Sequence, residues 1–294
     1  MALVRVTIQL PFRLRLLEGD YPTPEPGYPL HVRGYLQSIG GPPLTYRGNT
    51  SVWTRFDAAE LPSPDEAQKL KAESASRLLR GTNRLLQWYR VSTGDSDINE
   101  LTPAEASPFQ FTFDDHPAIP WSDDSTLTFE ISKPKMRRAV KLSELSERVR
   151  AELTRNAVPP LTDLLLLDAE QAARLGRYRE AVLLCWSVID GAFNRKYERL
   201  VEARLVGEWT SAKQFLTGVD FGMRNKMTAA LFLVCGKSLF RELGPADWER
   251  LSNSYSKRND IIHRGDMASD TEAEQAIRIA QRVIAVLQNI PDPA

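Results

Sequence analysis

The spacing of apolar residues changes along this chain at about residue 133, and this change constrains the fold more than any other feature. Before it, short alternating or β-branched runs are bounded by Gly, Pro, Asp and Ser, a pattern typical of strands. After it, strand patterns stop, and long segments with apolar residues every three or four positions follow one another. The sequence therefore predicts an α+β N-terminal domain followed by an all-α helical bundle.

Residues 1–132 are expected to form four to six short strands and one long helix. The expected strands lie within residues 3–17 (broken at Pro11), 28–39, 49–56, 109–113 and 125–132. The helix is expected over residues 63–91, because Ser63 is a good N-cap and Pro64 suits the first turn. Its apolar stripe is interrupted at Ser74. One helix packed on a sheet is the predicted arrangement.

Residues 133–158 are interpreted as a basic linker and a polar helix between the two domains. The formal net charge of the chain is zero, but residues 1–132 carry 12 Lys and Arg against 17 Asp and Glu, a balance of −5. Residues 133–294 carry 26 against 21, a balance of +5, and the run 133–141 holds five of these positive charges. A basic half allows an RNA partner. A solvated linker with ordinary surface lysines explains the run equally well.

Residues 159–294 are expected to form four or five helices joined by modest loops. Helical spacing covers residues 161–176, 177–206, 224–240, 244–265 and 269–290. Pro245 stands near the start of the fourth segment and Gly265 at its end, where these residues favour helix boundaries. Ser269 and Glu272 form a capping-box pattern at the start of the last helix.

Several classes of protein are disfavoured by the composition. No apolar run approaches the ~18 residues of a membrane span, and the N-terminus alternates apolar residues with Arg, so we expect a cytoplasmic protein. Cys185 and Cys235 lie inside apolar stretches and are expected to be buried free thiols. The three histidines, His31, His116 and His263, are scattered, and no segment has zinc-ligand spacing. We therefore expect neither a metal nor another cofactor.

One polar segment near the C-terminus, Ser256 to Asp266, has a pattern suited to chemistry. Arg258 is followed directly by Asn259 and, after three more residues, by His263, and one final amphipathic helix follows. This pattern resembles the Arg-polar-x-x-x-His signature of the HEPN superfamily. The segment "AEQAARLGRYREAVLLCWSVIDGAFNRKY" looks like the first helical hairpin of that family. The resemblance covers residues 159–292 and leaves residues 1–132 unexplained.

The resemblance implies a metal-independent endoribonuclease with Arg258, Asn259 and His263 as catalytic residues. In RNA the 2′-hydroxyl can attack the neighbouring phosphate if a base removes its proton and hydrogen-bond donors stabilise the developing charge. An imidazole, with a reference pKa of about 6.5, suits the proton transfer. A planar guanidinium suits the phosphate oxygens, and an amide can add a neutral hydrogen bond.

Helix geometry leaves two ways to complete this site, either unwinding of the helix near Gly265 within one chain or a second copy of the chain. At about 100° per residue, Arg258 and His263 differ by roughly 140° around a straight helix, so they do not share a face. Trp248, Leu251, Tyr255 and Ile262 are expected to form an apolar stripe between them. HEPN nucleases are dimers whose motifs face each other, so we expect an isologous homodimer formed through the helical domain.

Three further residues have weaker functional interpretations. Lys257 and Arg264 are expected to contact RNA phosphates or only water. Asp190 occupies a position where the family often has an acid near the motif, although a polar residue on a helix shoulder is the commoner reason for such an acid. Asp114 and Asp115 are adjacent to His116, but neighbours on a strand point to opposite faces, so a metal site there is disfavoured.

The combination of a β-rich front and a HEPN-like end resembles bacterial defence proteins that cleave RNA on detecting phage. Residues 1–132 would then sense or position an unknown trigger, ligand or protein, and the nuclease would act as a toxin. Two alternatives remain open. The segment could be a hydrophilic helix end with its cations near the C-terminal dipole, or the protein could be a non-catalytic HEPN-fold dimer that binds a ligand.

Overall fold

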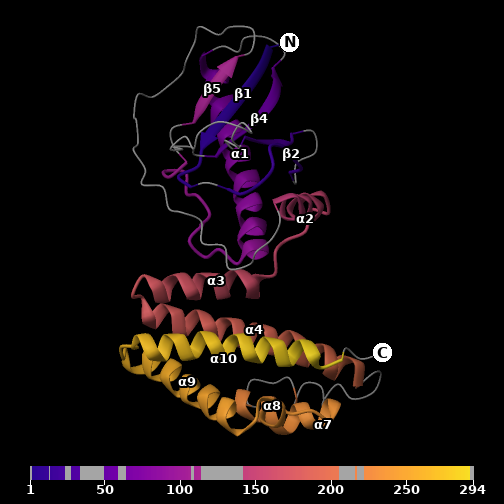
Figure 1. The fold of residues 1–294 in the computed structure, drawn as a ribbon, viewed down its shortest axis with the longest axis vertical. Helices are drawn as coiled ribbons and strands as arrows, with labels where there is room; N and C mark the ends of the chain where they lie inside the picture. Colours follow the sequence, from indigo (N-terminus) through magenta and orange to yellow (C-terminus); the bar gives the residue numbers. More distant parts are fainter. Residues whose placement is uncertain are drawn as a thin grey trace, which may run out of the picture. The chain divides into compact units, whose positions relative to one another are not determined.

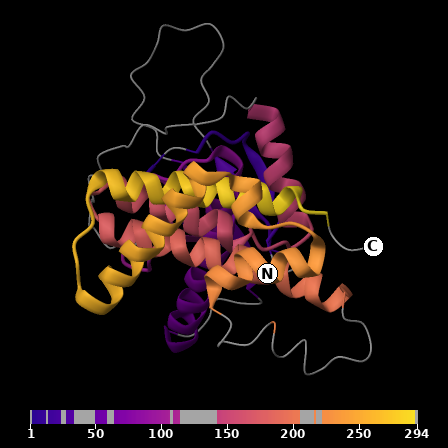
Figure 2. The same ribbon diagram turned by 90° about the horizontal axis from the view of Figure 1, so that it is seen from below.

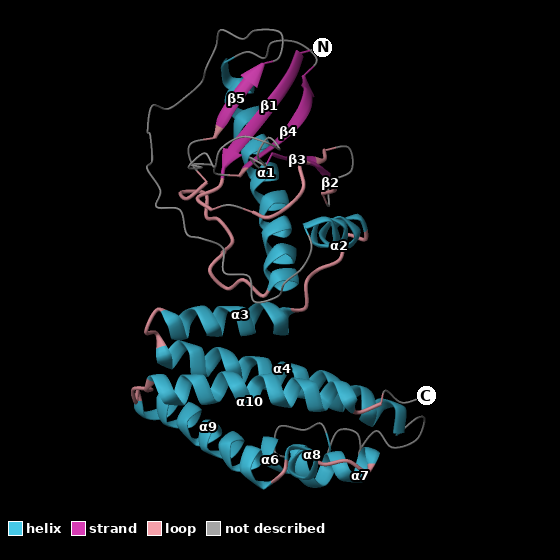
Figure 3. Ribbon diagram, viewed as in Figure 1, coloured by secondary structure: helices cyan, strands magenta, loops and turns pink. Residues whose placement is uncertain are grey.

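The computed structural model describes residues 2–12, 14–23, 28–33, 50–58, 64–106, 109–113, 142–204, 216 and 222–291. The chain divides into two compact units, Met1–Pro159 and Pro160–Ala294, and each unit has its own hydrophobic core. The first unit contains a small sheet with helices, and the described part of the second is helical (Figures 1 and 3). The predicted fold class, α+β followed by all-α, is confirmed.

The sheet of the first unit has five antiparallel strands in the order β2-β3-β4-β1-β5. The strands are β1 (Ala2–Gln9), β2 (Gly19–Tyr21), β3 (Leu30–Arg33), β4 (Ser51–Ala58) and β5 (Gln110–Phe113). Four of them overlap predicted segments, although β1 begins one residue before its segment and β4 ends two residues after its segment. The three-residue strand β2 was not predicted, and the expected strand at 125–132 lies outside the described residues.

Helix α1 (Pro64–Thr93) packs against one face of this sheet. Alternation along β1 directs Val6 and Ile8 into the core, while the intervening Thr7 is only partly buried. Leu85 and Tyr89 of α1 are fully buried against them in the same cluster. The predicted single long helix on a sheet is therefore present.

On the other face of the sheet, His31 has two partners that its position in the sequence did not suggest. Its ring stacks on Trp53 at a centroid distance of 3.9 Å, and its Nδ1 forms an ion pair with Asp20. The guanidinium of Arg5 lies 4.6 Å from the centre of the Trp53 ring. His31, Trp53 and Arg5 therefore form a row of side chains on this face of the sheet. His116, together with Asp114 and Asp115, lies outside the described residues.

Helix α2 (Leu142–Thr154) belongs to the first unit, whereas the sequence pattern suggested a linker there. Leu145, Val149 and Leu153 are buried in the first core, and α2 packs against α1. Trp88 of α1 donates a hydrogen bond of 3.0 Å to the carbonyl of Ala157, beyond the end of α2. The four-residue spacing of these apolar side chains gives α2 one buried face, which accounts for its place in the core. The basic run at 133–141 lies outside the described residues.

The second unit is built on four long helices, α3 (Leu161–Arg174), α4 (Tyr178–Arg204), α9 (Pro245–Arg264) and α10 (Asp270–Asn289). Helix α4 packs against both α3 and α10, and α9 packs against α4 and α10 (Figures 1 and 2). Phe193 and Tyr197 of α4 are fully buried and stack at a centroid distance of 5.4 Å. The predicted helical bundle is confirmed for the described residues of this unit.

The segment 224–240, predicted as one helix, contains four elements, of which the first three run on without a break over 223–235 and the fourth follows a break at Gly236. They are α6 (Met223–Asn225), the π-helical turn η1 (Lys226–Ala230), α7 (Leu231–Cys235) and α8 (Leu239–Leu243). Gly236 ends α7 in a left-handed conformation with φ of 73°, which favours glycine. Ser238 then caps α8 by accepting a hydrogen bond from the backbone N–H of Arg241.

The cysteines are free, as predicted. Cys185 is fully buried in α4, and its burial, together with the charge of Glu170, raises the pKa of its thiol to about 12. Cys235 is partly buried, and its Sγ donates a hydrogen bond to the carbonyl of Leu231. A thiol that stays protonated at neutral pH is a poor nucleophile, so Cys185 has a packing role.

Candidate functional site

Helix α9 carries the whole Arg-polar-x-x-x-His motif. Pro245 occupies its first turn, where the missing N–H costs nothing, and Gly265 ends it with φ of 73°. The N–H of Gly265 bonds to the carbonyl of Ile261, and that of Asp266 to the carbonyl of Asp260. The helix therefore continues without a break through Arg258, Asn259 and His263.

The buried face of α9 lies on the side of the helix that carries Arg258, away from His263. Leu251, Ser254 and Ile261 are buried, and Ser254 Oγ accepts a hydrogen bond of 2.9 Å from Trp186 Nε1 of α4. The predicted apolar stripe is correct for Leu251 and, as partly buried residues, for Trp248 and Tyr255. It is wrong for Ile262, whose side chain is 48% exposed, because the helix turns Ile261 inward instead.

Arg258 and Asn259 follow each other on α9, and both are partly buried. The Nη1 of Arg258 donates a hydrogen bond of 2.9 Å to Oδ1 of Asn259. Asp190, on α4, interacts electrostatically with Arg258. Burial raises the pKa of the Asp190 carboxyl, and the charge of Arg258 only partly offsets this increase. The structure thus gathers three of the predicted residues, from two helices, into one polar cluster.

His263 is exposed in the last turn of α9, four residues after Asn259 and therefore on the same helix face as that amide. Because the helix is regular between the two residues, Arg258 and His263 point about 140° apart. Unwinding near Gly265, which could have joined them within one chain, does not occur before Arg264. A single copy of the chain therefore does not bring this guanidinium and this imidazole to one point.

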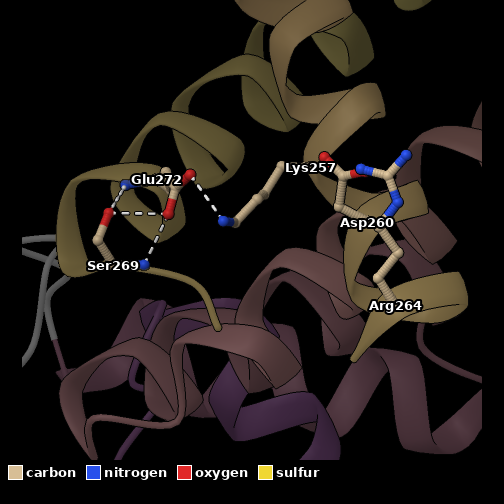
Figure 4. A network of polar contacts seen from close by, with 5 residues as sticks. All are labelled: Lys257, Asp260, Arg264, Ser269 and Glu272. Carbon is tan, nitrogen blue, oxygen red and sulfur yellow. Dashed lines mark hydrogen bonds and ion pairs between the residues drawn. The ribbon is translucent and has the colours of Figure 1, made fainter. Parts of the chain in front are cut away.

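Lys257 and Arg264, the residues assigned to RNA contacts, each form an ion pair. Lys257 Nζ lies 3.1 Å from Oε1 of Glu272, and Arg264 Nη1 lies 3.3 Å from Oδ1 of Asp260 (Figure 4). Each carboxylate neutralises part of the positive charge that the sequence suggested. The Arg264–Asp260 pair is near the surface, where such a pair contributes only about 0–1 kcal/mol to stability, whereas Lys257 is only 21% exposed.

Glu272 links this network to the start of α10. Its Oε2 accepts hydrogen bonds from the backbone N–H and the Oγ of Ser269, at 2.7 and 2.9 Å, and the Ser269 Oγ accepts in turn from the Glu272 N–H (Figure 4). Partial burial raises the pKa of Glu272, but these hydrogen bonds and Lys257 together outweigh it and lower the pKa. The predicted capping box is present and fixes the loop that follows His263.

A cavity of about 290 Å³ opens beside Asn259. Its walls are largely aromatic and aliphatic: Trp186, Met223, Arg224, Met227, Trp248, Leu251, Ser252, Tyr255, Ser256 and Asn259. Trp186 and Tyr255 meet edge to face at 5.0 Å, and the guanidinium of Arg224 lies 6.0 Å from the centre of the Trp248 ring. Met227 comes from the π-helical turn, a local structure that often occurs at functional sites.

A second concavity, of about 320 Å³, lies between α4 and α10 and is basic. Arg195, Lys196 and Arg199 line it together with apolar residues such as Leu287. These three cations were not among the site residues predicted from the sequence. Their spacing, i, i+1 and i+4 on one helix, was visible, but only the packing of α10 shows that they border a groove.

The sequence did not predict the aromatic cavity either, because its residues looked like ordinary core positions at helical spacing.

Among the described residues, no group of three or more His, Cys, Asp or Glu side chains could hold a metal ion. No helix in the same part of the chain is long and apolar enough to cross a membrane.

No protein-family model matches the chain, and neither a curated protein nor a solved structure gives a match.

Proposed function

We propose that the protein is a HEPN-type endoribonuclease that cuts RNA without a metal ion, in a site shared by two copies of α9. The observation that carries the proposal is the arrangement of Arg258, Asn259 and His263 on one unbroken helix. That helix stands directly before the last helix of an all-α unit, and its guanidinium is held beside Asn259 and Asp190. The order of elements and the spacing agree with the HEPN resemblance.

The chemistry follows from the groups present. An imidazole of His263 takes the proton of a ribose 2′-hydroxyl, the O2′–P bond forms and the P–O5′ bond breaks. The leaving 5′-oxygen takes a proton from an imidazolium, and the N–H groups of Arg258 stabilise the charge on the phosphate oxygens in between. The products carry a 2′,3′-cyclic phosphate and a 5′-hydroxyl. None of these steps needs a metal ion.

A second copy supplies the geometry that one helix lacks. Two α9 helices related by a two-fold axis would set the Arg258 of one copy toward the His263 of the other. Exposed apolar side chains near His263 support such a contact, since Ile262 is 48% exposed and Met267 is 72% exposed. We expect light scattering at micromolar concentration to give the mass of a dimer.

Two features of the same unit suit a single-stranded nucleic acid. Proteins of this class combine a basic groove with aromatic side chains on which bases stack. Trp248 and Tyr255 of the aromatic cavity supply rings next to Asn259, and Arg195 and Arg199 border the basic groove. A toxin or anti-phage role in the cytoplasm is part of the proposal and rests on the resemblance.

A cleavage assay on a structured RNA tests the function. The wild-type chain is expected to cut the RNA in the presence of EDTA and to leave 2′,3′-cyclic phosphate ends. His263→Ala is expected to lose at least about 10²-fold in rate, the lower end of the effect of a general base. Arg250→Ala, which removes another exposed cation of α9 outside the motif, is the matched control and should cut normally.

Absence of cutting by a chain that still dimerises would contradict the nuclease and favour the non-catalytic, ligand-binding alternative. Cutting that EDTA abolishes, or that His263→Ala leaves unchanged, would also contradict it.

A further inference from the structure

The first unit contains a pocket of about 410 Å³ that has no part in the proposed nuclease site. It is lined by Thr23, Tyr28, Leu30, Thr54, Arg77, Leu78, Arg80, Gly81, Asn83, Arg84, Gln87 and Glu100. Its volume falls within the range of small-molecule sites, roughly 300–1,000 Å³. Three arginines and one glutamate give the described lining a balance of +2, which favours an anionic ligand.

The three arginines form a row along one face of α1. On a helix, Arg77, Arg80 and Arg84 fall within about 60° of one another and extend over about 10 Å along the axis. The guanidinium of Arg77 stacks on the Tyr28 ring at 5.5 Å, and Arg80 Nη1 donates to Ser76 Oγ at 2.7 Å. A row of planar, permanently charged groups over this length suits a chain of linked phosphates better than a single phosphate.

The floor of the pocket depends on a close approach of α1 to the segment that leads into β3. Gly81 is buried there, and a Cβ added to it would lie 3.2 Å from Thr23 Cγ2 and 3.3 Å from a methyl of Leu30. Leu30 and Leu78 are almost fully buried and provide an apolar surface beside the cations. The absence of a side chain at position 81 therefore lets the helix and the strand segment meet beneath the arginines.

One rim of the pocket is fixed by hydrogen bonds to the segment after α1. The side-chain amide of Asn83 both donates to the carbonyl of Leu101 and accepts from its N–H, at 2.9 and 2.8 Å. Gln87 donates to Glu100 at 2.7 Å and accepts from Arg84 at 3.2 Å. Arg84 and the single carboxylate among the described lining residues are thus held in place at one end of the row.

We propose that this pocket binds a linear di- or triphosphate group. Such a group is carried by nucleotides and also occurs as an inorganic chain, and both sources would place their phosphates along the arginine row. The first unit would then be the part of the protein that binds this phosphate chain. The inference is independent of the nuclease proposal, because every residue involved belongs to the first unit.

Isothermal titration of the full chain with inorganic tripolyphosphate, at low salt and without divalent metal, tests the proposal. Saturable binding is expected, and Arg80→Gln and Arg84→Gln should each weaken it about tenfold or more, since each removes a charge-assisted contact. Arg148→Ala, an exposed arginine of α2 outside the pocket, should bind like the wild type. ATP that binds more tightly than tripolyphosphate identifies a nucleotide as the source, and ATP that binds no better identifies the inorganic chain.

Three results would overturn the proposal. The first is no heat of binding at millimolar tripolyphosphate. The second is equal weakening by Arg148→Ala and Arg80→Gln, which would show only general attraction to a cationic surface. The third is orthophosphate binding as tightly as tripolyphosphate, which would show that the length of the row has no part in recognition.

Discussion

The carboxyl of Asp190 and the guanidinium of Arg258 are the most informative pair at the scale of single residues. Burial makes the charged form of Asp190 costly, and Arg258, on the neighbouring helix, is the cation that offsets part of this cost. The guanidinium itself is partly buried and donates a hydrogen bond to Asn259. A positioning role for Asp190 is consistent with this arrangement.

We predict that Asp190→Asn changes the pH dependence of stability. The folded-state pKa of Asp190 is raised, so the folded chain holds this proton to higher pH than the unfolded chain does. Its ionisation therefore costs stability as pH rises from the ordinary value toward the raised one. Thermal unfolding should show that the variant gains stability relative to the wild type between about pH 3 and pH 7.

The matched control is Glu198→Gln, which removes an exposed carboxylate from the same helix. A melting-temperature difference between Asp190→Asn and wild type that stays constant over this range would count against the buried, costly carboxylate.

At the scale of helices, the junction between α9 and α10 fixes the position of the motif. The reciprocal hydrogen bonds of Ser269 and Glu272 start α10, and the Lys257–Glu272 ion pair joins that start to α9. The segment after His263 is therefore anchored at the next helix start.

Replacing the cap should weaken this junction. Ser269→Ala is expected to lower the free energy of unfolding by about 1 kcal/mol, the usual value of an N-cap side chain. Ser187→Ala, at an exposed mid-helix serine that bonds only its own helix, should change it by only a few tenths of a kcal/mol. Urea unfolding measures the free energy of unfolding of both variants. If the two substitutions lower it equally, the prediction that the Ser269 cap stabilises the helix start is contradicted.

The sequence predicted α9 and α10 because their boundaries have local causes, namely Pro245, Gly265 and the Ser269 cap. Over 224–240 it predicted the helical run up to Cys235, but it missed the π-helical turn inside that run and the break at the left-handed Gly236. It also predicted that Lys257 and Arg264 contact RNA phosphates or only water. Their carboxylate partners were visible as residues, but which cation pairs with which acid depends on how α9 meets α10.

The two-part organisation of the whole molecule was predictable from the change in hydrophobic period, whereas the pockets were not. The Arg77, Arg80 and Arg84 row could be read from the sequence as a charged helix face. Only the approach of Leu30 and Gly81 turns that face into the wall of a cavity. Likewise, Trp248 and Tyr255 have the spacing of core residues and line a cavity instead.

Separate cores predict that damage to one unit leaves the other folded. Phe193→Ala removes a fully buried ring from the second core and should destabilise that unit by about 3–5 kcal/mol. Hydrogen exchange should then rise in α4 and α10 while the amides of β1 and α1 remain protected. Loss of protection throughout both units would show that the chain unfolds as one body.

The central claim, that two copies of α9 build one ribonuclease site, is tested most directly by mixing two inactive variants. Arg258→Ala keeps its histidine and His263→Ala keeps its arginine, so a heterodimer retains one of each, on different chains. RNA cleavage with 2′,3′-cyclic phosphate ends is predicted to reappear after the two are unfolded together and refolded, although neither variant cuts alone. If heterodimers form, as measured by mass spectrometry of tagged chains, and the mixture stays inactive, the shared site is contradicted.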